Sequence, residues 1–103
     1  MPKATKSNLG QAAEFFVAAD FLARGLDGTK PLNVNGWDDL HVKCSGRWFT
    51  IQVKHGTRNP NTGKLYSKSR PAQLQSDILA IVHLPSKSIR YVSVKLPVPE
   101  ELL

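Results

Sequence analysis

The stretch from residue 40 to residue 54 constrains the fold most, because it alternates like a β-hairpin around a Ser45-Gly46 turn. Successive side chains of a strand point to opposite faces. Apolar side chains occupy every second position, at Leu40, Val42 and Cys44 before the turn and at Phe49, Ile51 and Val53 after it. A two-residue turn pairs these positions with one another, so we expect one face of the hairpin to cover a core.

The opposite face of this hairpin is polar and gathers Asp39, Gln52 and Lys54. The same register places Asp39 opposite Gln52, with Lys54 as the diagonal neighbour, whereas Asp38 has the other parity. Hard divalent cations prefer oxygen ligands, which a carboxylate and an amide supply. A lysine beside them can orient water or stabilise charge on a phosphate. The alternative is an ordinary solvent-exposed face of an amphipathic hairpin.

Residues 8–24 have the composition of a long helix, with Ser7 or Asn8 as its cap and Gly25 as its left-handed end. One apolar face at helical spacing predicts the side turned to the core. Its members are Ala12, Phe15, Phe16, Ala19, Leu22, Ala23 and Leu26. Val17 and Phe21 lie on the other side, so we expect cover on two sides and predict a subunit interface at these two residues.

The remaining chain predicts a turn at residues 27–31, a short strand at 32–35, and further strands at 78–82 and 89–94. Residues 55–76 are rich in Gly, Pro, Asn and Ser, which is typical of a loop. The order of elements predicts an α/β or α+β fold, in which one long N-terminal helix covers a sheet. The length predicts a single domain over residues 1–103.

The charge balance favours a polyanionic partner, chiefly nucleic acid, because 14 Lys and Arg face eight Asp and Glu. The predicted loop contains no acid, and its cations are suited to phosphate contacts that do not depend on base sequence. These cations are Arg58, Lys64, Lys68 and Arg70. The alternative is a solubilising surface segment. A single cysteine, no apolar run of ~18 residues and no secretory signal predict an intracellular, cytoplasmic protein without membrane spans.

These residues resemble the motifs of the PD-(D/E)xK nuclease superfamily. Asp39-Leu40 is similar to the first acidic motif, Ile51-Gln52-Val53-Lys54 to the second, and Glu14 to an acid supplied by the helix. The glutamine variant resembles a branch that includes intron-encoded homing endonucleases and Holliday-junction-resolvase-like proteins. Asp77, ahead of an apolar strand, also resembles that branch, although an acid here can equally cap the preceding turn.

The resemblance implies a restriction-endonuclease-like mixed sheet of about five strands and a Mg²⁺-dependent DNA endonuclease or resolvase-like activity, with Mn²⁺ as a possible substitute. It implies that Asp39, Gln52 and Glu14 hold the metal ion and that Lys54 positions the attacking water. It also implies that Asp77 orients the ligands without contacting the ion. The expected substrate is duplex or branched DNA. A chain this short covers little DNA, so we expect a homodimer or homotetramer.

Gln52 departs from the family pattern, because the second motif usually carries an acid at this position. The site therefore has less negative charge with which to hold a cation. This departure equally suits a non-catalytic nucleic-acid-binding module that keeps the nuclease fold. A separate alternative is a structural assembly protein with no role on DNA.

Overall fold

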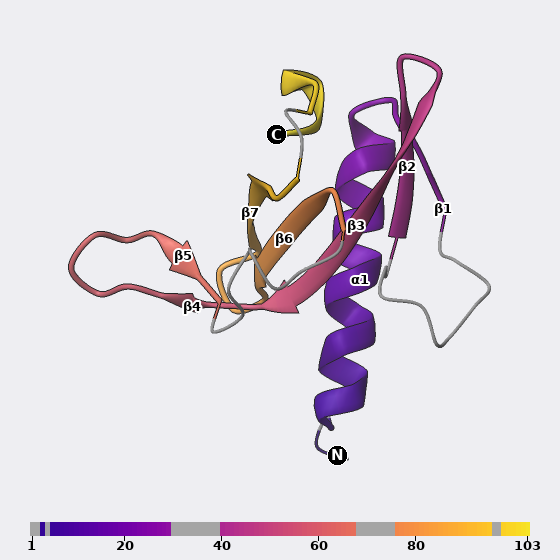
Figure 1. Cartoon of the computed structure of the whole chain (residues 1–103). Coiled ribbons are helices and arrows are strands. Elements are labelled where there is room, and N and C mark those ends of the chain that lie inside the picture. The colour runs from indigo at the N-terminus through magenta and orange to yellow at the C-terminus, as the bar shows by residue number, and fades with distance from the viewer. Residues whose placement is uncertain (1–2, 4, 30–39, 68–75, 96–97) are drawn as a thin grey trace.

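The predicted hairpin lies at the centre of a five-stranded sheet with the order β1-β2-β3-β6-β7 (Figure 1). The structure is a computed structural model that describes residues 3, 5–29, 40–67, 76–95 and 98–103. Its strands are β1 (Asp27–Thr29), β2 (Leu40–Cys44), β3 (Arg47–His55), β6 (Ile78–His83) and β7 (Ser88–Ser93). The helix α1 (Lys6–Ala23) packs on one face of this sheet, and two short strands, β4 (Thr57–Arg58) and β5 (Leu65–Tyr66), form a separate ribbon.

The hairpin has the register that its alternation predicts. Leu40 pairs with Ile51, and Val42 pairs with Phe49. At the turn, Ser45 and Gly46 both have positive φ angles, of 54° and 78°. A two-residue turn with this geometry matches the right-handed twist of the strands that it joins. The prediction of one apolar and one polar face is therefore confirmed for residues 40–55.

The sheet is mixed, as expected for this fold class. β3 and β6 run parallel, from the pair of Ile51 with Ile78 to the pair of His55 with Val82, whereas the other neighbouring strands are antiparallel. β6 is buried on both faces except at its last residue, which explains why its sequence is a continuous apolar run.

Helix α1 begins two residues earlier than the sequence predicts, because Thr5 and not Ser7 or Asn8 is its N-cap. The Thr5 hydroxyl accepts a hydrogen bond from the Asn8 backbone N–H, and the Asn8 side-chain oxygen accepts one from the Thr5 N–H, each at 3.1 Å. This reciprocal capping box satisfies two backbone donors that would otherwise lack partners. The predicted end is confirmed, since Gly25 has a φ angle of 82°.

The predicted core face of α1 is wrong. The buried residues are Ala13, Val17 and Phe21, whereas Phe15 and Leu22 are 64% and 59% exposed. Val17 and Phe21 are therefore unavailable as a subunit interface, because they lie in the chain's own core. The sequence does not distinguish the two sides, since α1 carries two apolar stripes and only the position of the sheet selects between them.

Two further predictions need correction, and one lies outside the described residues. Residues 27–29 form strand β1, paired with β2, where a turn was expected. The segment expected to be a loop after β3 contains the β4–β5 ribbon. The short strand predicted at 32–35 lies outside the described residues. At the C-terminal end, the short helix η2 (Glu100–Leu102) places Leu102 in the core.

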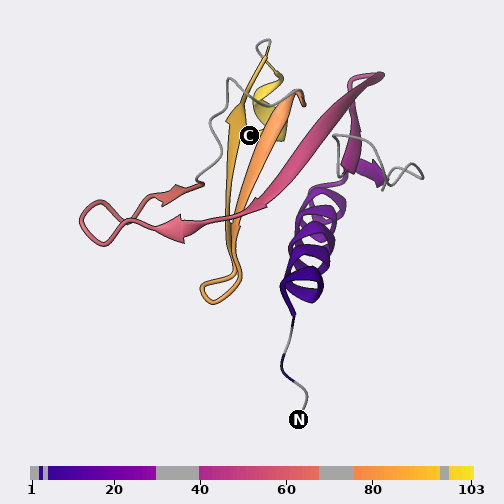
Figure 2. The ribbon, with the colours of Figure 1, turned by 60° about the horizontal axis from the view of Figure 1, so that its bottom comes forward.

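The sheet has two distinct faces. On the face covered by α1, the strands contribute Leu40, Val42, Ile51, Val53, Ile78, Ala80 and Val82, among other residues, to the main core. On the opposite face, Leu79 and Ile81 pack with Leu65 of the ribbon in a smaller cluster. We call this second side the ribbon face. The ribbon leaves the end of β3 and extends away from α1 (Figure 2). Within the described residues, no helix is long and apolar enough to cross a membrane.

Candidate functional site

Strand β3 presents Gln52 and Lys54 on the ribbon face. Ile51 and Val53 are buried in the core that α1 shares, and the pleat turns the residues between and beyond them to the other side. Gln52 and Lys54 are each half-buried. The structure therefore brings these two predicted site residues to the same face of one strand, as their parity predicts.

Strand pairing adds a further polar residue, Arg90, to the same face of the sheet. Lys54 pairs with Ile81 of β6, and Ile81 pairs with Arg90 of β7. Lys54 and Arg90 therefore share the ribbon face two strands apart, at about 10 Å given the usual spacing of strands. The Arg90 Nη1 donates to the Leu65 carbonyl oxygen at 2.9 Å, which ties β7 to the ribbon.

Arg90 was missed from the sequence. The alternation of Arg90 with Ile89 and Tyr91 indicates only that the Arg90 side chain points away from the core. The additional signal is the register between β6 and β7, which places Arg90 in the same row as Lys54. That register depends on the length of the intervening turn.

Asp77 joins the start of β6 to β3 by binding Thr50, which lies two residues before Gln52. Its Oδ2 accepts hydrogen bonds from the Thr50 backbone N–H at 2.9 Å and from the Thr50 hydroxyl at 3.1 Å. The Asp77 N–H donates back to the Thr50 Oγ1 at 3.0 Å. Asp77 is therefore an anchor between two strands on the ribbon face, and any support that it gives to Gln52 passes through Thr50.

The predicted phosphate-binding residues divide into two groups. Arg58 and Lys64 are exposed on the ribbon, whereas Lys68 and Arg70 lie outside the described residues. Arg58 is held in place, because its Nη1 donates to the Gly63 carbonyl and its Nη2 donates to Ser86 and Ser88. The ribbon is thus attached to the turn between β6 and β7 through a guanidinium group.

Gly56 lets the chain pass from β3 into the ribbon. Its N–H donates to the Val82 carbonyl at 2.8 Å. A Cβ atom at this position would overlap the side chain of Ile81 and approach the Tyr66 carbonyl oxygen to 2.8 Å. The close approach of three backbone segments, two residues beyond Lys54, therefore depends on a residue without a side chain.

The remaining acids of the candidate site are not all described. Asp39 lies outside the described residues, so its convergence with Gln52 stays a prediction. Glu14 is half-buried on α1, beside Ala13 and on the core side of β3. Gln52 and Lys54 lie on the opposite face of the sheet, so a role for Glu14 as a ligand beside Gln52 stays a prediction.

The described part of the chain contains no group of three or more His, Cys, Asp and Glu side chains that would hold a metal ion. The predicted ligands fall outside that definition, because Gln52 is an amide and Asp39 is not among the described residues. The side-chain oxygen of the half-buried Gln52 is a ligand of the type that Mg²⁺ accepts.

The fold is similar to that of a bacterial homing endonuclease, I-Ssp6803I. The two structures match with a TM-score of 0.74 and 19% sequence identity, over 89% of this chain and 67% of the other. Neither a protein-family model nor a curated protein matches the chain. At this identity, the likeness to I-Ssp6803I establishes the fold, while the roles of individual residues depend on the geometry described above.

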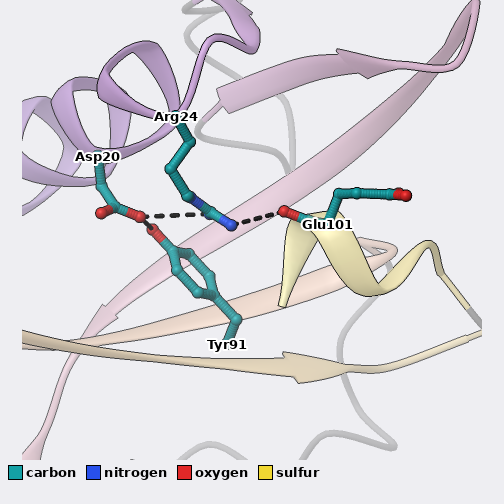
Figure 3. Close-up of polar contacts among 4 residues, drawn as sticks. All are labelled: Asp20, Arg24, Tyr91 and Glu101. Atoms are coloured by element: carbon teal, nitrogen blue, oxygen red, sulfur yellow. Dashed lines mark hydrogen bonds and ion pairs between the residues drawn. The ribbon is translucent and has the colours of Figure 1, made fainter.

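A second polar cluster lies on the α1 side of the sheet, at the end of the helix (Figure 3). The Tyr91 hydroxyl donates to Asp20 Oδ2 at 2.6 Å, and Arg24 lies 3.2 Å from the same oxygen. Burial, and then the hydrogen bond to Asp20, raise the pKa of Tyr91 above its ordinary value. Arg24 also donates to the Glu101 carbonyl at 2.6 Å, so this cluster ties η2 and β7 to the helix.

This cluster borders a hollow of about 320 Å³. Its carboxylate and its guanidinium bind each other, and the phenol keeps its proton. The cluster therefore stabilises the fold and provides no general base. The candidate site remains on the ribbon face, around Gln52 and Lys54.

Proposed function

We propose that this chain is a Mg²⁺-dependent DNA endonuclease domain that hydrolyses phosphodiester bonds. One observation carries the proposal: Gln52 and Lys54 lie half-buried on the same face of β3, where β6 pairs with the strand on one side. The similarity of the fold to a homing endonuclease supports the same conclusion.

Each residue of the site has a defined task in this proposal. Lys54 orients the attacking water and stabilises the negative charge that develops on the phosphate. The carboxylate of Asp39 and the amide oxygen of Gln52 hold the metal ion, with Glu14 as a further ligand directly or through water. When bound, Mg²⁺, or Mn²⁺ in its place, polarises the phosphoryl oxygen and lowers the pKa of a bound water.

The charge distribution supports DNA as the partner. Residues 40–67 and 76–95 contain many Lys and Arg but a single carboxylate, Asp77, and that carboxylate is bound to Thr50. The other described acids lie on α1, β1 and η2. Cations without neighbouring acids attract the phosphate backbone and release its counterions.

We further propose that two copies of the chain associate through the exposed side of α1, as a homodimer or as half of a homotetramer. Ala12, Phe15, Ala19 and Leu22 follow one another at intervals of three and four residues, which is the spacing of a helix–helix seam. All four are exposed. The positions that flank this seam carry no charge, so a second copy of this basic chain meets no like charge there. The flanking residues are Gln11, Phe16, Ala18 and Ala23.

The test of the nuclease proposal is incubation of supercoiled plasmid and of a four-way junction with the purified protein, in Mg²⁺ and in EDTA. Nicking or linearisation that requires the metal supports the proposal. Preference for the junction indicates a resolvase-like specificity.

The neutral amide of Gln52 favours one alternative, a DNA-binding module without activity. That alternative predicts strongly salt-dependent binding and no cleavage in either buffer. Absence of any binding at ~50 mM salt contradicts both functions and favours a role in assembly, because electrostatic binding is strongest at low salt.

A further inference from the structure

The turn between β6 and β7 carries a basic, hydroxyl-rich cluster, which the predicted phosphate-binding residue Arg58 joins from the ribbon. It consists of Arg58 from the ribbon together with His83, Ser86, Lys87 and Ser88. The Arg58 Nη2 lies 3.1 Å from the Ser86 Oγ and 2.9 Å from the Ser88 Oγ. The His83 Nδ1 lies 2.6 Å from the Ser86 Oγ, and the two serine hydroxyls are 2.9 Å apart.

This arrangement differs from an ordinary surface arginine, because every described partner of the Arg58 guanidinium is neutral. Within the described residues, no ion pair links Arg58 or Lys87 to a carboxylate; the ion pair that is present joins Arg24 and Asp20. Among the described residues, no carboxylate neutralises the Arg58 guanidinium, and its hydrogen bonds fix its orientation. Three of its five N–H groups are donated to Gly63, Ser86 and Ser88, and the positive charge with the remaining donors can hold a phosphate oxygen.

Lys87 adds a second charge at the tip of the turn. It is exposed and has a φ angle of 52°, between the two serines. It also borders the hollow that contains Asp20, but that carboxylate is already bound to Arg24 and Tyr91. Neither residues 57–67 nor residues 83–91 contain an acid, so no carboxylate of the ribbon or of the turn itself repels an anion at this cluster.

His83 and Ser88 of the cluster lie on the ribbon face near Lys54, whereas Lys87 at the tip of the turn borders the hollow on the α1 side. Lys54 pairs with Ile81, and His83 follows two residues later on the same face. The spacing of residues and strands in a sheet puts the backbones of Lys54 and His83 about 8 Å apart. A DNA strand rises ~3.4 Å per nucleotide along the helix axis, so one strand can reach both points within a few nucleotides.

We propose that Arg58, Ser86, Lys87 and Ser88 form a second phosphate-binding site, which holds the DNA backbone a few nucleotides from the phosphate at Lys54. The inference rests on the proposed action on DNA, and it assigns the positioning of the backbone to the β6–β7 turn. Lys87 and Arg58 supply charge, and the two serines orient Arg58 and offer hydroxyl groups to the phosphate.

The test is the affinity for a fluorescent DNA duplex, measured by anisotropy in EDTA over a range of salt concentrations. Lys87→Gly removes the charge at a position whose positive φ angle suits glycine. Lys95→Ala removes the same charge at the opposite end of β7 and serves as the matched control. A Ser86→Ala/Ser88→Ala double variant leaves every formal charge in place. Thermal unfolding checks that each variant is folded.

We expect Lys87→Gly to weaken binding roughly three- to tenfold at low salt and to reduce the salt slope by about 1. The double serine variant is expected to weaken binding several-fold, because Arg58 loses its orientation, whereas Lys95→Ala has a smaller effect. Equal effects of Lys87→Gly and Lys95→Ala, with a double serine variant that binds like the wild type, would overturn the inference. So would a wild-type protein that binds no duplex.

Two further measurements separate this inference from neighbouring ones. A protein that cleaves DNA but binds it independently of the turn contradicts the second site alone, whereas turn-dependent binding without cleavage contradicts only the nuclease proposal. Free phosphate offers the same chemistry as the DNA backbone. Saturable binding of inorganic phosphate at constant ionic strength, together with DNA affinity that is independent of Lys87, would assign the cluster to that ion and overturn the inference.

Discussion

The hydroxyl of Tyr91 on β7 donates a 2.6 Å hydrogen bond to Asp20 on α1, and this bond joins the helix to the last strand of the sheet. The phenol is partly buried against Phe21, with the two ring centroids 5.1 Å apart. Burial and the neighbouring carboxylate both favour the protonated phenol, so the pKa of Tyr91 is raised in the folded state. This contact therefore gives the fold a specific dependence on alkaline pH.

We predict that Tyr91→Phe loses about 1–2 kcal/mol of stability at neutral pH, because a hydrogen bond to a charged group is removed. The raised pKa means that the unfolded state releases its proton above pH ~10 while the folded state keeps it. The free energy of unfolding of the wild type should consequently fall as pH rises above ~10. The difference in this free energy between the wild type and Tyr91→Phe should therefore narrow. Urea unfolding at several pH values measures this. The exposed Tyr66→Phe is the control, and a constant difference across the pH range would contradict the prediction.

Gly56 is predicted to be intolerant of any side chain. Gly56→Ala should destabilise the protein by about 1–3 kcal/mol, because the new methyl group overlaps Ile81 and the Tyr66 backbone. Gly10→Ala is the matched control, since a Cβ atom there meets nothing within 4 Å. Gly10→Ala should stabilise the fold by about 0.5–1 kcal/mol, because alanine is preferred to glycine in the interior of a helix. Denaturant midpoints compare the two variants, and equal effects of the same sign would rule out the close approach at Gly56.

The exposed side of α1 is predicted to carry the contact between copies. Phe15→Glu should shift the protein to monomers in sedimentation experiments with little loss of thermal stability, because Phe15 is 64% exposed. Tyr66→Glu places the same charge on an exposed aromatic residue of the ribbon and should leave the oligomeric state unchanged. A wild-type protein that is monomeric at high concentration would exclude this interface.

Gln52 is predicted to limit the affinity for the metal ion. Gln52→Glu adds a carboxylate to the ribbon face, and a carboxylate binds a hard cation more strongly than an amide does. The Mg²⁺ concentration for half-maximal cleavage should therefore fall several-fold. Ser45→Asp, which adds the same charge at the exposed turn between β2 and β3, should leave it unchanged. Equal Mg²⁺ requirements for wild type and Gln52→Glu would show that the side chain at position 52 does not contact the ion.

The sequence was sufficient for features that depend on local periodicity. The alternation of residues 40–54 determined the register of the hairpin and the shared face of Gln52 and Lys54, because a slip of one residue would have turned Phe49 and Ile51 to solvent. The apolar run at residues 78–82 likewise predicted a strand, and the structure buries that strand on both faces. The hairpin prediction is strong because only one register buries all of the alternate apolar side chains.

The sequence was insufficient where tertiary contacts choose between equivalent local solutions. Val17 and Phe15 are both large and apolar on α1, and only the position of the sheet determines which one is buried. Arg58 could be identified as a cation, but its attachment to Ser86 and Ser88 depends on where the ribbon meets a turn 28 to 30 residues away along the chain. Arg90 acquires its place beside Lys54 only through the pairing of three strands.

The most direct test of the central claim compares cleavage by Lys54→Ala with cleavage by Lys43→Ala in Mg²⁺. Lys43 lies on the same polar side of the hairpin, paired with Trp48, so its replacement removes an equal charge far from Gln52. We predict that Lys54→Ala lowers the cleavage rate by about 10²-fold or more while it still binds duplex DNA, because it loses the group that stabilises the transition state. Lys43→Ala should cleave at nearly the wild-type rate. Equal rates for the two variants would contradict the assignment of the ribbon face as the active site.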